Sequence, residues 1–459
     1  MRKYSNIINT EISWIPQIPA HWELKKIDTL FTERKKKVSD RDYEPLSVTK
    51  KGILPQLEHA AKSNDGDNRK LVKKGDFVIN SRSDRKGSCG VSKMDGSVSL
   101  INIVLTPRDE LNSEYIHYLL RNYRFSEEYY RNGRGIVADL WTTRYSEMRT
   151  ILLPVPPRAE QDQIVRFLDW KVSEINKLIG IRRKEIQELE ELKDNIIFQA
   201  TTSGLNKNVP MKRTGNIWLG TIPEQWDVVQ VRRAYSVILG KMLSPKPLDF
   251  TYTYENYVCA KDVHFDGVNL SNLKKMWFST AEKKQYKIKT GDLLVVEGGA
   301  GAGNAALVDE PLGHEVFVQN SIHIIRPKNN LTTNKFLAYW IRSLVRRGYM
   351  KFVCNVATIP HYTKDKVMST VMPLPPLKEQ QEIVRYLANE SLKIENLINK
   401  KYSQITVLQE LKGSLISDVV TGKTDVRNIP VPAYEHVEDM GDDAGEGNEE
   451  EAGIPGEED

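Results

Sequence analysis

Residues Pro154 to Leu205 read PVPPRAEQDQIVRFLDWKVSEINKLIGIRRKEIQELEELKDNIIFQATTSGL, and the chain contains this stretch twice. The second copy, Pro373 to Thr424, reads PLPPLKEQQEIVRYLANESLKIENLINKKYSQITVLQELKGSLISDVVTGKT at a constant offset of 219. From Pro156 to Leu168, eight of thirteen residues are identical to those in the second copy. A repeat of this length predicts a chain built from two similar halves.

Each copy predicts a long helix with one narrow apolar stripe. The Pro-Pro pair keeps the preceding backbone extended and suits a first helical turn, and Glu160 and Glu379 follow near the positive end of the helix dipole. The stripe consists of matched apolar residues at spacings of three and four, with one gap of seven: Ile175, Ile179, Ile186, Leu189, Leu192 and Ile196, then Ile394, Ile398, Ile405, Leu408, Leu411 and Leu415. Arg182 and Lys401 stand in the two gaps. This spacing predicts a coiled-coil seam, and about 40 residues of helix in each copy predict a rod about 60 Å long.

The alternative is a pair of surface helices that merely cover a core. A narrow stripe with polar flanks, sustained over several heptads, favours the seam.

Composition and charge limit the class of protein. With 459 residues, 40% hydrophobic and 28% charged, the chain predicts a soluble protein of two or three domains. It has no run of 18 apolar residues and no apolar signal core at its N-terminus, so nothing marks export or membrane insertion. Cys89, Cys259 and Cys354 lack metal-ligand spacing, which fits a reducing cytoplasm and argues against zinc and disulfides.

The acidic C-terminal stretch offsets a large net positive charge on the rest of the chain. Residues 435–459 hold twelve acidic residues and no Lys or Arg, so the first 434 residues carry 66 minus 49, or +17. A body this basic predicts a nucleic-acid partner. The stretch from Ile429 onward is rich in Pro, Gly, Asp and Glu, and we expect it to be disordered and to keep the protein soluble. The alternative is that it competes with DNA for the basic body.

The repeat extends beyond the helices. The stretches Trp14-Ile15 and Ile18-Pro19-Ala20-His21-Trp22 return as Trp218-Leu219 and Ile222-Pro223-Glu224-Gln225-Trp226, which predicts core tryptophans at the edges of two similar domains. A Gly-Asp turn and a short buried strand also recur, at residues 74–79 and 290–295. The loops that follow differ, because residues 80–88 are polar and basic whereas residues 297–304 are rich in glycine. Similar scaffolds with different loops suit two sites of different specificity.

The glycine-rich loop has a second interpretation, a cradle for a phosphate or a nucleoside cofactor. No Lys-Ser/Thr pair follows it, and the next residues lack a helix pattern. A tight turn between strands is therefore favoured.

Basic, aromatic and hydroxyl residues gather after a short helix predicted in each half, at residues 113–122 and 334–343. Such a mixture can hold phosphates, while neighbouring side chains reach base edges. The predicted DNA-binding residues are Ser81, Arg82, Arg85, Lys86, Arg131, Arg134, Thr143 and Arg144 in the first half, and Asn304, Arg346, Arg347, His361, Tyr362, Thr363 and Lys364 in the second. The residues expected to reach bases are Arg82, Arg85, Arg134 and Arg144, then Asn304, His361, Tyr362 and Lys364.

Two alternatives remain open for this set. Charge runs often form only a solvated helix face. Thr143-Arg144, which aligns with Thr363-Lys364, is equally suited to capping a helix, with Thr363 as an N-cap.

Taken together, these features resemble the specificity subunit of type I restriction-modification enzymes over essentially the whole chain. The resemblance rests on the matched Ile-Pro stretches ending in Trp22 and Trp226, the Gly-Asp strands, and Pro154 to Gln161 with Pro373 to Gln380. The stretch Thr421 to Arg427 also looks like that family's C-terminal segment, whereas the acidic tail beyond it is not part of the pattern.

The resemblance implies an α+β fold with a pseudo-twofold internal repeat. Two target-recognition domains would each read half of a split DNA sequence, and two antiparallel conserved helices would hold them apart. The expected segments are a first recognition domain at 1–153, a first spacer helix at 154–205, a second recognition domain at 206–372, a second spacer helix at 373–424 and a tail at 425–459.

The partners implied by the resemblance are double-stranded DNA, two adenine-methylating subunits docked on the helices, and ATP-dependent motor-nuclease subunits. This chain would bind no cofactor, since S-adenosylmethionine, ATP and Mg belong to those subunits. The residues expected to serve partner docking and the spacer helices are Glu160, Gln161, Ile164, Arg166, Ile175, Ile179, Ile186 and Leu189, with Glu379, Gln380, Ile383, Arg385, Ile394, Ile398, Ile405 and Leu408.

The chain carries no recognisable catalytic motif of its own. Adenine methylation needs an Asn/Asp-Pro-Pro-Tyr/Phe pocket, but both Pro-Pro pairs lie in Val-Pro-Pro-Arg and Leu-Pro-Pro-Leu. Metal-dependent cleavage needs clustered carboxylates, and Glu191-Leu-Lys193 and Glu410-Leu-Lys412 have no Pro-Asp upstream. We expect a non-catalytic subunit. The alternative is a coiled-coil interaction scaffold with incidental, non-specific DNA binding.

Overall fold

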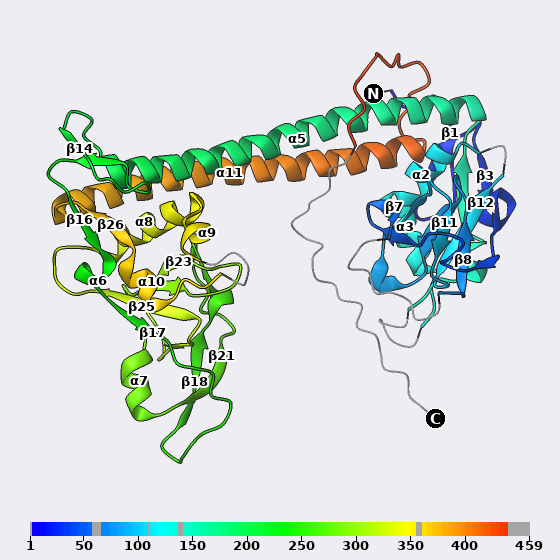
Figure 1. Ribbon diagram of the computed structural model, residues 1–459. Coiled ribbons are helices and arrows are strands. Elements are labelled where there is room, and N and C mark those ends of the chain that lie inside the picture. The colour runs from blue at the N-terminus through cyan, green and yellow to red at the C-terminus, as the bar shows by residue number, and fades with distance from the viewer. Residues whose placement is uncertain (1, 57–65, 109–110, 136–140, 355–359, 439–459) are drawn as a thin grey trace. The chain divides into compact units, whose positions relative to one another are not determined.

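A computed structural model of the protein describes residues 2–56, 66–108, 111–135, 141–354 and 360–438 (Figure 1). The chain forms two compact units, the first from Met1–Lys184 with Lys401–Asp459 and the second from Glu185–Lys400. Two long helices, α5 (Arg158–Ser203) and α11 (Leu377–Val420), run from one unit into the other and confirm the helices predicted from the repeat.

The first unit is built on an antiparallel sheet ordered β10-β9-β12-β4, with a smaller sheet ordered β11-β8-β5 beside it. Its central strand β9 is buried throughout because its sequence, Phe-Val-Ile-Asn, is mostly apolar. Gly75 makes the turn before β9 with φ 92°, a backbone conformation that favours glycine. The strands are β1 (Ile7–Asn9), β2 (Gln17–Pro19), β3 (Glu23–Lys26), β4 (Phe31–Glu33), β5 (Lys37–Val38), β6 (Leu46–Thr49), β7 (Gly52–Pro55), β8 (Arg69–Val72), β9 (Phe77–Asn80), β10 (Cys89–Val91), β11 (Gly96–Val98), β12 (Asn102–Pro107) and β13 (Leu152–Val155).

The second unit repeats this plan with sheets ordered β17-β25-β22-β23 and β21-β18-β24. The apolar strand β22 is buried throughout, as β9 is. The strands are β14 (Met211–Arg213), β15 (Thr221–Pro223), β16 (Asp227–Gln230), β17 (Tyr235–Leu239), β18 (Thr253–Val258), β19 (Val263–His264), β20 (Gly267–Val268), β21 (Lys274–Phe278), β22 (Leu293–Val296), β23 (Ala305–Leu307), β24 (Phe317–Val318), β25 (Ile322–Pro327) and β26 (Val371–Leu374).

Short helices complete each unit. In the first they are α1 (Ile27–Leu30), α2 (Ser113–Arg121), α3 (Tyr123–Arg131) and α4 (Tyr145–Met148). In the second they are α6 (Val231–Ala234), α7 (Thr280–Tyr286), α8 (Asn334–Arg346), α9 (Tyr349–Val353) and α10 (Lys364–Ser369). The expected α+β class is confirmed.

Each long helix directly follows a paired strand of the unit in which it begins. In the first unit β13 pairs with β3 and leads directly into α5, and in the second β26 pairs with β16 and leads into α11. The tryptophans predicted as core anchors are buried at Trp14, Trp22 and Trp226, whereas Trp218 is half-buried.

Segments of α5 and α11 lie side by side in opposite directions within each unit. In the first unit the Gln163 amide donates to the Val426 carbonyl at 3.1 Å, and the Lys412 ammonium donates to Asn176 Oδ1 at 3.2 Å. In the second unit Lys193 Nζ lies 2.5 Å from Glu395 Oε1. Because Asn176 and Lys193 match Glu395 and Lys412 at the offset of 219, one contact recurs in both units.

The apolar stripe is only partly as predicted. Its buried members include Ile175, Ile179, Ile186, Ile394, Ile405 and Leu415. Leu192 and Leu411 are instead 48% and 54% exposed, and Lys193, 6% exposed, takes the inward place. An α-helix has 3.6 residues per turn, so a strict 3.5-residue repeat drifts around it, and the buried face moves on to Lys193 and Ile197.

The residues after α11 pack onto the first unit. Asp425 pairs with Arg2, and the Arg427 guanidinium lies 4.9 Å from the Tyr4 ring centre. Composition predicts disorder from Ile429 onward, but the Asn176 amide of α5 donates to the Val437 carbonyl at 2.9 Å. Residues 429–438 therefore differ from the prediction because α5 supplies their backbone with hydrogen-bond partners, and residues 439–459 lie outside the described part.

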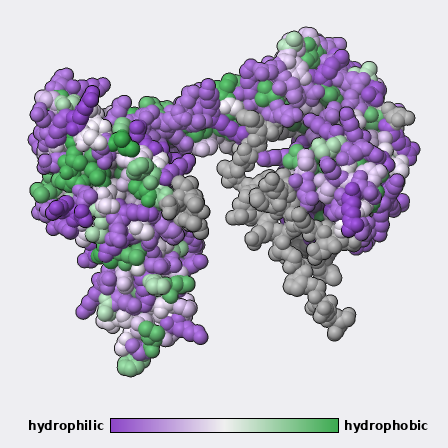
Figure 2. All heavy atoms as spheres, viewed as in Figure 1, coloured by the Kyte–Doolittle hydropathy of each residue, from purple (hydrophilic) through white to green (hydrophobic). Residues whose placement is uncertain are grey.

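The face of each unit seen in Figure 2 is mostly hydrophilic, with scattered apolar patches. Within the described residues, no helix combines the length and apolarity needed to cross a membrane. The same residues contain no cluster of three or more His, Cys, Asp or Glu side chains fit to hold a metal ion.

Candidate nucleic-acid interface

In the first unit, three segments that are distant in sequence meet where β9 ends. The Thr143 amide donates to the Ser81 carbonyl at 2.9 Å, and Thr142 pairs with both Arg82 and Arg134. We call the pairing of residues 81–82 with 142–143 the first loop pair. It brings the basic loop after β9 together with the end of α3 and the segment before α4.

The second unit contains the same arrangement at the end of β22. The Tyr362 amide donates to the Glu297 carbonyl at 2.6 Å, and Gly298 pairs with His361. We call the pairing of residues 297–298 with 361–362 the second loop pair. The backbone connections therefore match between the units while the side chains differ, with Ser81-Arg82 in one and Glu297-Gly298 in the other.

The loop pairs correct one alignment made from the sequence. The sequence aligns Thr143-Arg144 with Thr363-Lys364, whereas the backbone hydrogen bonds of the two loop pairs place Thr143 in the position of Tyr362. The helix starts agree with the corrected alignment, because Arg144 is the N-cap of α4 and Thr363 is the N-cap of α10. Thr363 thus stands at the N-cap, as its alternative interpretation predicts, although its side chain makes no capping hydrogen bond.

The side chains of Thr143 and Tyr362 hold the two loop pairs in place from the protein interior. Both side chains are fully buried. Thr143 Oγ1 donates to the Tyr129 carbonyl at 3.1 Å, and the Tyr129 hydroxyl returns a bond to the Thr143 carbonyl at 2.9 Å. The Tyr362 hydroxyl lies 2.5 Å from Thr370 Oγ1. These two side chains, and buried Ser81, hold the loops in place rather than reaching a ligand on the surface.

The other predicted DNA-binding residues near the loop pairs lie nearer the surface. Arg82, Arg131, Arg134, Arg144, His361 and Lys364 are exposed, and Arg85, Lys86, Asn304 and Thr363 are half-buried. Lys86 forms an ion pair with Glu127, and Arg131 pairs with Glu128 at 2.7 Å. Such surface ion pairs contribute about 0–1 kcal/mol, so a phosphate can replace them.

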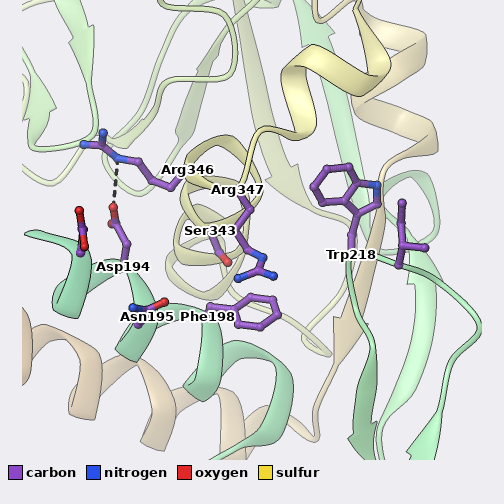
Figure 3. A pocket seen from close by; sticks show the side chains of 9 residues that line it. Asp194, Asn195, Phe198, Trp218, Ser343, Arg346 and Arg347 are labelled. Carbon is purple, nitrogen blue, oxygen red and sulfur yellow. Dashed lines mark ion pairs between the residues drawn. The ribbon is translucent and has the colours of Figure 1, made fainter.

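Arg346 and Arg347 lie elsewhere, against α5 (Figure 3). Arg346 Nε is 3.4 Å from Asp194 Oδ2, and the Arg347 guanidinium sits 3.9 Å from the Phe198 ring centre. They line a cavity of about 470 Å³ with Trp218 and other residues of the second unit. These two arginines thus contact side chains of α5, Asp194 and Phe198, as well as standing in the set predicted to bind DNA.

Several residues predicted to serve partner docking and the spacer helices anchor the helices to their own units. Gln161 Oε1 accepts the backbone N–H of Asn112, the N-cap of α2, at 2.8 Å. Gln380 Oε1 accepts the N–H of Thr333, the N-cap of α8, at 3.2 Å. Ile164 and Ile383 are fully buried, as is Gln380. Buried side chains cannot contact a docked protein, and among the described docking residues predicted at the helix starts only Arg166 and Arg385 are exposed.

A second apolar face on the helices was missed by the sequence analysis. It comprises Leu178, Ile181 and Leu192 on α5, and Leu392, Leu397, Val407 and Leu411 on α11, each more than 40% exposed. Two matched pairs recur at the offset of 219, Leu178 with Leu397 and Leu192 with Leu411. The signal that could have revealed this face was the presence of apolar residues on both sides of the predicted seam.

His323 of β25 supports the second loop pair from within the core. Its Nε2 donates to the Tyr362 carbonyl at 2.9 Å, and burial lowers the pKa of the imidazole from 6.5 to about 4. Between pH 6.5 and about 4, His323 takes up a proton in the unfolded chain but stays neutral in the folded protein. The contribution of His323 to stability is therefore fully present above pH 6.5 and is lost as the pH falls towards 4.

We expect His323→Gln, which keeps an N–H donor but does not titrate, to reduce the acid-induced loss of stability. The reduction between pH 7 and pH 4 should be on the order of 3 kcal/mol. Urea unfolding at a series of pH values measures it, with exposed His314→Gln as the control. An unchanged pH dependence in His323→Gln would contradict the prediction.

Comparison with known proteins gives a matching family and several related proteins. Residues 223–407 match the family described as the Type I restriction modification DNA specificity domain. The chain is 24% identical over 293 residues to the type I restriction enzyme MjaVIII specificity subunit of Methanocaldococcus jannaschii, a match that covers 61% of this chain and 63% of that subunit. It is 23% identical over 331 residues to the putative MjaX specificity subunit of the same organism, covering 71% of each.

A solved structure has a similar fold. A chain from work on the complex assembly and conformational transition of the type I R-M system superposes with a TM-score of 0.63. The match covers 89% of this chain and 99% of that one at 16% sequence identity. At this identity the likeness shows a shared fold.

Proposed function

We propose the following function for this chain, which belongs to the type I restriction-modification specificity subunits: it reads a two-part DNA sequence and directs partner subunits to it. The observation that carries the proposal is the repeated loop pair. One backbone frame presents Arg82 and Thr142 in the first unit and Gly298 and His361 in the second. Two frames with different side chains suit two different half-sites.

Phosphate contacts would supply most of the affinity. The first 434 residues carry 66 minus 49, or +17, so binding should weaken steeply as the salt concentration rises. Exposed arginines at the first loop pair suit guanine edges in the major groove, where bidentate arginine contacts are the commonest specific ones.

The exposed apolar residues of α5 and α11 support the docking of partner proteins on each unit, because exposed apolar patches mark protein interfaces. Its matched pairs, Leu178 with Leu397 and Leu192 with Leu411, suit two copies of one partner. We propose two methyltransferase subunits, joined by motor-nuclease subunits for restriction. S-adenosylmethionine, ATP and Mg would bind those subunits, this chain would be non-catalytic, and the complex would act in the cytoplasm.

The test is to map methylated adenines by single-molecule sequencing in cells that express the partner methyltransferase with and without this chain. We expect a split motif of methylated adenines that disappears when the chain is absent. If the methyltransferase is active and no motif depends on the chain, the proposal fails, and a protein-interaction scaffold with incidental DNA binding becomes the better account.

Replacing Arg82 with alanine should relax one base position of the first half-site. Arg82 is exposed at the first loop pair, and a specific base contact discriminates by about 5- to 150-fold against other bases. Methylation rates on oligonucleotides substituted at each position measure the effect. Arg131→Ala serves as control, since Arg131 lies on α3 beside Glu128 and should affect all sequences alike. Uniform weakening by both variants would make Arg82 a phosphate contact.

A further inference from the structure

We propose that Glu297 determines specificity by accepting a hydrogen bond from the exocyclic amino group of a cytosine in the second half-site. The inference rests on the proposed function and names one chemical group that the second unit would recognise. Glu297 was absent from the residues predicted from the sequence, because it precedes the glycine-rich loop and is not basic.

The backbone of Glu297 is fixed on both sides. Its amide donates to the Ser321 carbonyl at 2.8 Å, and its carbonyl accepts the Tyr362 amide at 2.6 Å. Tyr362 is itself held by His323 and Thr370. The side chain of Glu297 therefore leaves the end of β22 from a rigid position, as accurate base recognition requires.

Two glycines follow Glu297, and one of them faces open space. The Gly298 backbone lies against the His361 ring, since a Cβ atom added at Gly298 would be 2.9 Å from His361 Nδ1. A Cβ atom added at Gly299 would meet nothing within 4 Å, and Gly299 has φ 85°. At Gly298 and Gly299 the loop therefore has no side chain that could stand between Glu297 and an approaching base edge.

The carboxylate of Glu297 is available for such a bond. Among the residues that the structure describes, it forms no hydrogen bond or ion pair. Partial burial raises the pKa of this carboxyl group, and the charge of His361 opposes the shift. Two other polar side chains of the interface here, His361 and Lys364, are exposed.

The chemistry of duplex DNA limits what a carboxylate can bind. Phosphates repel it, and base-edge acceptors such as guanine O6 and N7 offer it no proton. The exocyclic amines remain, and the cytosine N4 amine is the usual partner of Glu in the major groove. In the first unit the matching position is Ser81, which is buried, so this readout belongs to the second half-site alone.

The experiment uses the full chain assembled with its partner methyltransferase. Methylation motifs and relative methylation rates on substituted oligonucleotides are compared for wild type, Glu297→Ala and Glu297→Gln. We expect Glu297→Ala to relax one cytosine position of the second half-site by about 5-fold or more, with the first half-site unchanged. We expect Glu297→Gln to shift that position towards adenine, which glutamine binds through N6 and N7.

Glu310→Gln is the matched control, because it removes one negative charge from an exposed position of the same unit. It should leave every motif position unchanged. Retained recognition of the first half-site shows that the Glu297 variants are folded. An unchanged motif in Glu297→Ala, or relaxation at a base other than cytosine, would overturn the inference. If wild type yields no motif at all, the proposed function fails first and this inference with it.

Discussion

Glu160→Ala is expected to lower the free energy of unfolding by about 3–5 kcal/mol. Glu160 is only 6% exposed. One carboxylate oxygen accepts the Tyr4 hydroxyl at 2.6 Å and Trp22 Nε1 at 3.1 Å, and the other lies 2.7 Å from His21 Nε2. Alanine would leave a buried hydroxyl and a buried indole N–H without partners at the start of α5, and that loss makes the effect large.

The repeat provides a control for this experiment. Glu379 occupies the equivalent position, and Trp226 Nε1 donates to it at 2.9 Å. Because Glu379 has one such partner among the described residues where Glu160 has three, we expect Glu379→Ala to cost about 1.5–3 kcal/mol. Urea unfolding followed by tryptophan fluorescence compares the two variants. Equal losses for the two, or no loss for Glu160→Ala, would show that the carboxylate network is not a main source of stability.

Removing one heptad from each long helix should abolish recognition of the native two-part site. The matched deletions are residues 182–188 and 401–407, which shorten each helix by about 10 Å, close to three base pairs of DNA. The hypothesis is that helix length sets the gap between half-sites, because base-reading domains must meet DNA faces that recur every 34–36 Å. A seven-residue deletion keeps the apolar stripe in register.

Adenine-methylation mapping again provides the measurement. We expect the native motif to disappear, and any motif that replaces it to keep both half-sites with a shorter gap. A deletion in α5 alone serves as control, since it breaks the match between the helices and should reduce folding instead of changing the gap. A doubly deleted protein that still methylates the native motif with its original gap would refute the hypothesis.

Some features of this protein follow from local sequence alone. The 219-residue offset predicts two similar units, and the Pro-Pro starts and apolar spacing predict helices that the structure has at Arg158–Ser203 and Leu377–Val420. The Gly-Asp turns likewise precede the buried strands β9 and β22. These features are readable because backbone periodicity and glycine turns depend on residues a few positions apart.

Other features depended on tertiary contacts between separate elements of the fold. The sequence could not show that Thr143 and Tyr362 are buried supports, that Gln161 and Gln380 bind the starts of neighbouring helices, or that Lys193 faces inward in place of Leu192. Gln161 and Gln380 bind partners 49 and 47 residues away along the chain, and the drift of the helix face places Lys193 inward. The repeat therefore determined the two-unit plan, and tertiary packing decided which side chains hold each loop pair and which, such as Arg82 and Glu297, remain to meet a ligand.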